Sequence, residues 1–154
     1  MSVAIVLPAR RASTRLPNKL LLEAGGKTIL EHTTERAKQA QRCSAGLITK
    51  ILVAADDEKL IAAARRAGVD AVMTDPNHTS GTDRIAEAVE KLKGAGEFKE
   101  DYVVNLQADE PEIDPANIVL VAKLLADADA AVQMATLAVP IYDEETFRAP
   151  NVVK

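Results

Sequence analysis

The chain has 154 residues, a net charge of −4 and 47% hydrophobic residues, a composition that suits one globular domain over residues 1–154. The acidic balance and the aromatic content of only 3% argue against a nucleic-acid partner, because such proteins present basic surfaces or aromatic stacking platforms. No apolar run approaches the length of about 20 residues that a membrane helix needs, and no signal-peptide pattern opens the chain. We therefore expect a cytoplasmic protein without membrane insertion.

Short apolar runs alternate with helical patterns along the chain. In order, the expected elements are a strand at 3–7, a helix at 28–42, a strand at 50–55, a helix at 58–67, a strand at 70–74, a helix at 80–93, a strand at 102–108, a helix near 115–125 and a strand at 130–139. Apolar strands that alternate with helices favour an α/β fold with a mostly parallel sheet. In such folds, ligands bind outside the carboxyl ends of the strands, so the loops that follow the strands are the candidate sites.

The loop after the first strand is basic. It reads PARRASTRLPNK and carries Arg10, Arg11, Arg15 and Lys19. It matches neither the dinucleotide fingerprint nor the P-loop, yet Arg, Lys and the hydroxyls of Ser13 and Thr14 are suitable phosphate ligands. A solvated loop whose cations balance nearby acids is the alternative interpretation.

Two acids, Asp109 and Glu110, directly follow the strand at 102–108. Mg²⁺ is commonly bound by one or two carboxylates together with substrate phosphates. The alternative interpretation is that the pair only opens a turn before Pro111. In the loop HTSGTDR, Ser80 is a candidate helix cap and Gly81 permits a close backbone approach. Because no nucleophile triad or zinc spacing is evident, metal-assisted phosphoryl chemistry fits these groups best.

Four segments in order resemble the 3-deoxy-manno-octulosonate (KDO) cytidylyltransferases, also called CMP-KDO synthetases. They read PARRASTRLPNK, HTSGTDRIAE, VNLQADEP and MATLAVPI. The resemblance implies a Rossmann-like nucleotide-diphospho-sugar transferase fold with helices on both faces of the sheet. It also implies transfer of CMP from CTP to KDO with release of pyrophosphate, for lipopolysaccharide biosynthesis.

The resemblance also implies roles for individual residues. The predicted CTP-phosphate ligands are Arg10, Ser13, Arg15 and Lys19; the predicted nucleoside contacts are Pro8, Ala9, Ser80, Gly81 and Gln107; the predicted Mg²⁺ ligand is Asp109; and the residues expected to act in catalysis are Arg10, Lys19 and Asp109.

Two departures from the family pattern bear on these expectations. Ala108 replaces the usual Gly and adds a methyl group that could narrow the approach of the nucleotide. The sequence stops a little past the family's midpoint, so it is expected to carry only the N-terminal, nucleotide-binding portion, without the second metal carboxylate, most of the KDO pocket and the dimer contacts. Open alternatives are a related sugar acid (amino-KDO or sialic acid), a CTP-binding module without turnover, and a protein-interaction domain; a homodimer is also possible.

Overall fold

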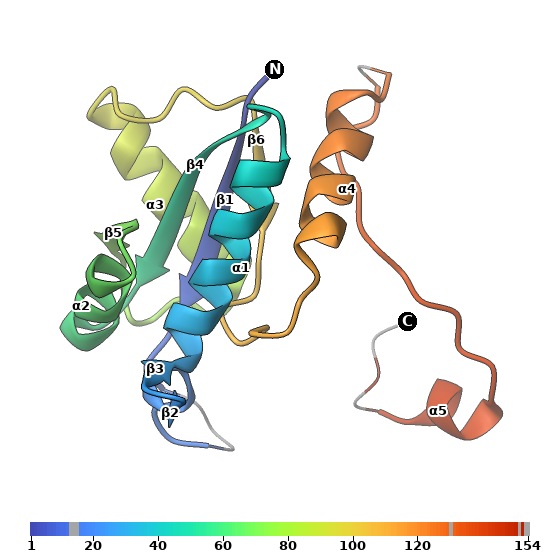
Figure 1. Cartoon of the computed structure of the whole chain (residues 1–154), viewed down its shortest axis with the longest axis horizontal. Coiled ribbons are helices and arrows are strands. Elements are labelled where there is room, and N and C mark those ends of the chain that lie inside the picture. Colours follow the sequence, from blue (N-terminus) through green and yellow to red (C-terminus); the bar gives the residue numbers. More distant parts are fainter. Residues whose placement is uncertain (13–15, 130, 151, 153–154) are drawn as a thin grey trace.

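A four-stranded parallel sheet lies at the centre of the computed structural model, which describes residues 1–12, 16–129, 131–150 and 152 (Figure 1). The strands are β1 (Val3–Ala9), β4 (Ile48–Ala55), β5 (Asp70–Met73) and β6 (Tyr102–Asn105), and their order across the sheet is β5-β4-β1-β6. Each neighbouring pair is parallel. The mostly parallel sheet predicted from the sequence is therefore confirmed.

Helices cover both faces of the sheet, as predicted. On one face, α1 (Ile29–Cys43), α2 (Glu58–Arg66) and α4 (Pro115–Ala126) contribute to a core with Ile5 and Leu7 of β1. On the other face, α3 (Gly81–Gly94) packs with Ala4 and Val6, and Figure 1 shows α1 and α3 on opposite sides of β1. Because side chains alternate along a strand, β1 supplies both cores, and its first five residues are all buried.

Local signals explain where the helices begin. Thr28 caps α1 through a capping box with Glu31, in which each side chain accepts a hydrogen bond from the other's backbone N–H. Asp57 caps α2, and Asp114 caps α4 just before a proline at the first helical position. These caps leave the helix bounds within two residues of those predicted.

The structure differs from the sequence prediction in the extent of the strands: β4 begins two residues earlier and β5 ends one residue earlier than predicted. β1 continues through Pro8 to Ala9, although proline cannot donate to a ladder. This is tolerated because β1 pairs with β6 only as far as Val6, so beyond that point it has one strand partner, β4. β6 in turn ends at Asn105 instead of Ala108. Short elements that were not predicted are η1 (Lys19–Leu21), β2 (Glu23–Ala24), β3 (Lys27–Thr28) and α5 (Glu144–Arg148).

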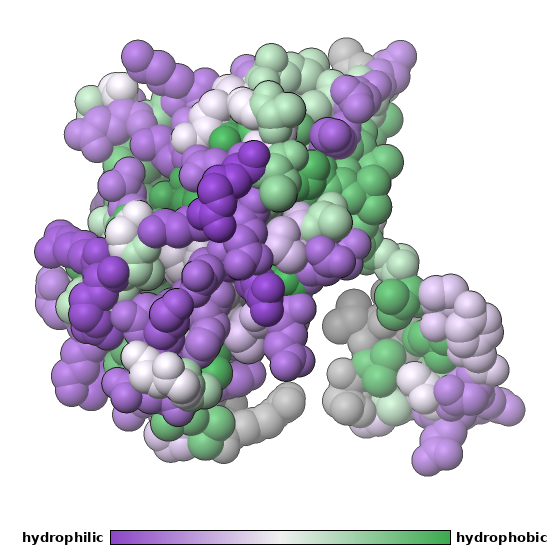
Figure 2. All heavy atoms as spheres, in the orientation of Figure 1, coloured by the Kyte–Doolittle hydropathy of each residue, from purple (hydrophilic) through white to green (hydrophobic). Residues whose placement is uncertain are grey.

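The strand predicted at 130–139 is wrong. Residue 130 lies outside the described residues, and residues 131–139 contain no strand. Met134 and Val139 are 83% and 85% exposed, whereas a strand needs a ladder partner as well as an apolar pattern. Residues 134–137 instead line an apolar groove of about 500 Å³ beside β6 and α4. Figure 2 shows hydrophobic surface at the position that α4 occupies in Figure 1. α4 also exposes Leu120 and Leu124.

Candidate functional site

The loops that follow β1 and β6 lie next to each other at the carboxyl ends of the strands. The strand order reverses between these two neighbouring strands, since β4 and β5 lie on one side of β1 and β6 on the other. The crevice at such a reversal is the usual ligand site of open parallel sheets. The basic loop follows β1, and Gln107 and Asp109 follow β6, so the topology places the predicted groups on both sides of this crevice.

A cavity of about 190 Å³ opens between these loops and the start of α3. Five predicted nucleotide contacts line it, which are Pro8, Arg10, Ser80, Gly81 and Gln107. His78, Thr79 and Arg84 also line it, although the sequence analysis did not assign them ligand contacts. Their contact with the cavity could have been predicted, because they belong to the same loop-to-helix segment as Ser80. The structure thus brings residues from three separate loops around one space.

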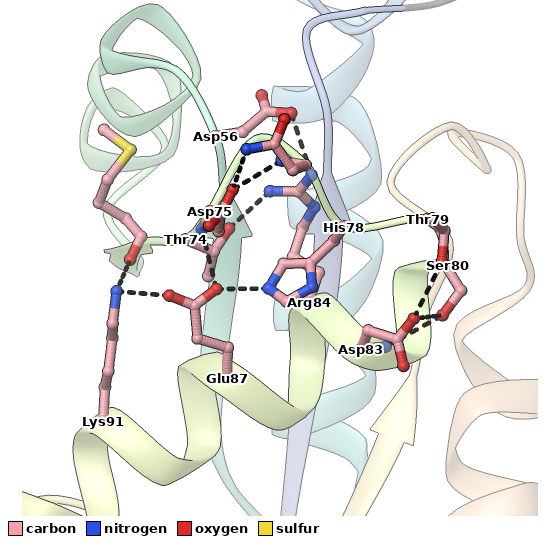
Figure 3. Close-up of polar contacts among 12 residues, drawn as sticks. Asp56, Thr74, Asp75, His78, Thr79, Ser80, Asp83, Arg84, Glu87 and Lys91 are labelled. Carbon is pink, nitrogen blue, oxygen red and sulfur yellow. Dashed lines mark hydrogen bonds and ion pairs between the residues drawn. The ribbon is translucent and has the colours of Figure 1, made fainter.

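The start of α3 forms one wall of this cavity. Ser80 is the N-cap: its Oγ accepts the Asp83 backbone N–H at 3.1 Å and donates to Asp83 Oδ2 at 2.7 Å, as Figure 3 shows. A Cβ added at Gly81 would lie 3.1 Å from Pro8 Cγ. Gly81 therefore permits close packing of α3 against the end of β1, in addition to any approach to a ligand.

The loop that leads into α3 is held by Glu87, one turn of helix beyond Arg84. Glu87 Oε2 accepts the Asp75 backbone N–H at 2.8 Å and lies 2.5 Å from His78 Nε2, while Lys91 Nζ contacts Oε1 at 2.6 Å (Figure 3). The Lys91 ammonium, followed by the Asp75 N–H and the His78 ring, lowers the pKa of Glu87 to about 2 against the opposing effect of burial. This loop is consequently fixed by charge-assisted bonds.

Across the crevice, the two residues predicted to act on phosphate and metal contact each other. Lys19 Nζ donates to Asp109 Oδ2 at 2.7 Å, and the two side chains are 42% and 40% exposed. Because both side chains are exposed, both are accessible to a ligand. An exposed pair of this kind also contributes little to stability. Arg10 is also exposed, whereas Ser13 and Arg15 lie outside the described residues.

A sequence model of the family described as Cytidylyltransferase matches residues 4–154. The chain belongs to the cytidylyltransferase family. Its relatives include the 3-deoxy-manno-octulosonate cytidylyltransferases of Vibrio campbellii, 46% identical over the whole chain and 57% of the relative, and of Acidovorax sp., 48% identical over 97% of the chain and 53% of the relative. The resemblance found in the sequence is thus confirmed, and the chain spans just over half the length of these relatives.

Solved cytidylyltransferase structures share the fold. The structure of CMP:2-keto-3-deoxy-manno-octonic acid synthetase complexed with CTP aligns with a TM-score of 0.73 and 38% identity, over 84% of this chain and 49% of the other. A cytidylyltransferase from Leptospira borgpetersenii aligns with a TM-score of 0.66 and 27% identity, over 86% of this chain and 52% of the other. The Rossmann-like nucleotidyltransferase fold predicted from the sequence is therefore confirmed.

Two small residues near the crevice of this cytidylyltransferase-family chain are buried. Ala9, for which a backbone contact was predicted, is fully buried and does not line the cavity. Ala108 is 3% exposed, packs in the larger core cluster, and is absent from the cavity lining. Its carbonyl oxygen accepts a hydrogen bond from Thr33 Oγ1 at 2.9 Å. The added methyl group therefore occupies core space instead of narrowing the cavity.

The carboxylate of Asp109 is a side chain at the site that could bind a metal ion. Within the described ranges, no three His, Cys, Asp or Glu side chains gather as a metal cluster. Asp109 is nevertheless a hard oxygen donor at the crevice, and Mg²⁺ commonly uses one or two carboxylates with substrate phosphates and water. The Asp109 carboxylate therefore fits a Mg²⁺ site that is completed by substrate phosphates.

Among the described residues, no helix is long and apolar enough to cross a membrane.

Proposed function

We propose that this chain binds CTP, with the nucleoside in the 190 Å³ cavity and the triphosphate against Arg10 and Lys19. The observation that carries the proposal is the meeting of the basic loop, the cavity and Asp109 at the strand-order reversal. The synthetase structure that is 38% identical to this chain is a complex with CTP, which supports the choice of nucleotide. The triphosphate is placed against the basic loop because guanidinium and ammonium groups are strong hydrogen-bond donors to phosphate oxygens.

The reaction we propose is transfer of CMP from CTP to KDO, as the names of the relatives indicate. The anomeric hydroxyl of the sugar attacks the α-phosphorus, the bond to the bridging oxygen of the β-phosphate breaks, and pyrophosphate leaves while the hydroxyl proton passes to solvent. Arg10 and Lys19 would offset the negative charge that develops on the leaving pyrophosphate. Because CTP and its products are soluble metabolites, the compartment we propose is the cytoplasm.

Asp109 is the residue we propose as a Mg²⁺ ligand. When bound, the ion would supply positive charge to the phosphate oxygens. Lys19 currently contacts the Asp109 carboxylate, so an arriving triphosphate would compete for the Lys19 ammonium and leave Asp109 available as an oxygen donor. The prediction is that divalent metal binds more tightly in the presence of CTP than in its absence.

Calorimetric titration with CTP and UTP, with and without Mg²⁺, tests the binding step. We expect CTP to bind, UTP to bind more weakly, and Lys19→Ala to weaken CTP binding about tenfold, since a charged hydrogen bond is removed. Lys27→Ala is the matched control, because Lys27 is a similarly exposed lysine that pairs with Glu35 at 2.6 Å outside the cavity lining. A folded chain that does not bind CTP would overturn the proposal.

Turnover is tested separately by release of pyrophosphate from CTP in the presence of KDO. CTP binding without pyrophosphate release would favour the second candidate, a CTP-binding module. The observation behind that candidate is the coverage, since the chain spans 57% of the Vibrio campbellii relative. Substituting amino-KDO or a sialic acid for KDO in the same assay separates the related sugar acids.

A further inference from the structure

A single carboxylate joins the two walls of the cavity. Asp56 directly follows β4, and its side chain is only 7% exposed. Its Oδ2 accepts a hydrogen bond from Arg84 Nη2 of α3 at 3.1 Å, and its Oδ1 accepts the backbone N–H of Arg11 at 2.8 Å. One oxygen therefore faces the helix that carries Ser80 and Gly81, and the other holds the basic loop next to Arg10.

Arg84 is itself fixed from a second direction. The residue is 2% exposed, and its Nη1 donates to Thr74 Oγ1 at 2.6 Å, which in turn donates to the Ala55 carbonyl at 3.0 Å. Figure 3 shows the Arg84 side chain between Thr74 and Asp56. Hydrogen bonds at both terminal nitrogens, Nη1 and Nη2, fix the orientation of the planar guanidinium. The carboxylate that it binds is therefore held in one place as well.

The side chain of Arg11 points away from this carboxylate. Its Nη1 pairs with Asp57 Oδ2 at 2.8 Å, and its Nε donates to Asn18 Oδ1 at 3.2 Å. Among the residues lining the cavity are Arg10 and Arg84, but not Arg11. Arg11 is thus an anchor of the basic loop at both its backbone and its side chain, and the adjacent Arg10 is left at the cavity.

Charge explains why the anchoring carboxylate is paired. An unpaired carboxylate beside a triphosphate site would repel the ligand, and an unpaired buried guanidinium would be costly. Pairing Asp56 with Arg84 cancels both charges while leaving Oδ1 available for the backbone. A buried ion pair is weak evidence for stability on its own, and the contact from Oδ1 to the basic loop points to a second role.

We propose that Asp56, held by Arg84, is a positioning residue for triphosphate recognition, because it sets the place of Arg10 relative to the start of α3. This inference rests on the proposed binding of CTP. It assigns Asp56 no contact with the ligand. Its loss should weaken the interactions of the β- and γ-phosphates with the basic loop, and should change those of the nucleoside and α-phosphate much less.

The test compares the dissociation constants of CTP and CMP by calorimetry in two variants. In Asp56→Asn, the side chain keeps one oxygen and can no longer serve both Arg84 and the Arg11 N–H. In Arg84→Lys, the charge stays but one ammonium replaces the two-pronged fork. We expect the preference for CTP over CMP to fall about tenfold in both variants, which corresponds to about 1.4 kcal/mol. The affinity for CMP should stay nearly unchanged in Asp56→Asn, whereas in Arg84→Lys only the preference between the two nucleotides is compared, because Arg84 itself lines the cavity.

Ile48→Ala is the matched stability control. Ile48 is 2% exposed and lies at the opposite end of β4 from Asp56, so its truncation destabilises the same strand without touching the loops. A purely structural role for Asp56 predicts that all three variants lower the thermal midpoint and keep the CTP preference. The Arg11 amide proton, followed by NMR, should shift in Asp56→Asn and stay in place in Ile48→Ala.

The outcomes separate this inference from the proposed function. A parent chain that binds neither nucleotide overturns the proposed function and, with it, the role in recognition. A parent chain that binds CTP, with a folded Asp56→Asn or Arg84→Lys variant that keeps the full preference for CTP, overturns only the positioning role. Failure of both variants to fold under conditions where Ile48→Ala folds would assign the pair to stability and also overturn it.

Discussion

Replacing Glu87 with Gln removes the charge that holds the loop before α3. The carboxylate is contacted by the Asp75 N–H, the His78 ring and the Lys91 ammonium, at 2.8, 2.5 and 2.6 Å. Glutamine has nearly the same shape and retains one oxygen, so the substitution isolates charge from packing. We expect the Glu87→Gln chain to fold and to be less stable at neutral pH.

The magnitude follows from the pKa of the carboxyl, which is lowered from 4.5 to about 2. Each unit corresponds to about 1.4 kcal/mol, so the shift has an upper limit of between about 3 and 4 kcal/mol. The side chain is 23% exposed, and we therefore expect about 1 to 2 kcal/mol after screening by solvent. Because the folded pKa is the lower one, this stabilisation is present above about pH 4.5 and is lost as the pH falls toward 2.

Urea unfolding of the two chains at pH 7 and again near pH 2.5 measures this directly. The difference in unfolding free energy between the parent chain and Glu87→Gln should be about 1 to 2 kcal/mol at pH 7 and should shrink toward zero at low pH. Glu90→Gln, at an exposed position on the same helix, should show little difference at either pH. An equal loss for Glu87→Gln at both pH values would refute the argument.

Three further substitutions test the packing around the site. Ala108→Gly removes a buried methyl group and adds backbone freedom, which should cost about 1.5 kcal/mol in urea unfolding; a gain in CTP affinity would contradict the placement of that methyl in the core. Ser80→Ala removes the cap that binds the Asp83 N–H, with an expected loss of about 1 kcal/mol; an unchanged thermal midpoint would count against it. Gly81→Ala places a Cβ 3.1 Å from Pro8 Cγ, so calorimetry should show weaker CTP binding, and full affinity would mean that Pro8 moves aside freely.

Local patterns in the sequence predict most of the fold. The apolar run that begins at Val3 becomes the buried central strand, and Thr28 and Ser80 mark the starts of α1 and α3. Such signals lie within a few residues of the element that they define. The segment at 131–139 shows where they fail, because its apolar pattern is compatible with a strand but pairing depends on a distant partner.

The candidate site divides in the same way. Arg10, Ser80 and Gln107, which the family resemblance predicted as nucleotide contacts, line one cavity. The bond between Asp56 and Arg84 was not predicted, because the two residues lie in different loop-to-helix segments and meet only when α3 packs on the sheet. The burial of Ala108 was missed for a related reason, since neighbouring residues in a loop give no indication of which side chain enters the core.

The pairing of β6 with β1 has a consequence for how the site forms. Val3 pairs with Tyr102, so this ladder closes a loop that contains most of the chain, whereas β1, β4 and β5 join through shorter connections. Closing a longer loop costs more chain entropy and slows the formation of the contacts that it brings together. Gln107 and Asp109 closely follow β6, so they are placed at the crevice only when β6 pairs with β1. Hydrogen exchange should therefore show the β6 amides opening before those of β4. In that partly open state the crevice is lost while the rest of the sheet remains folded.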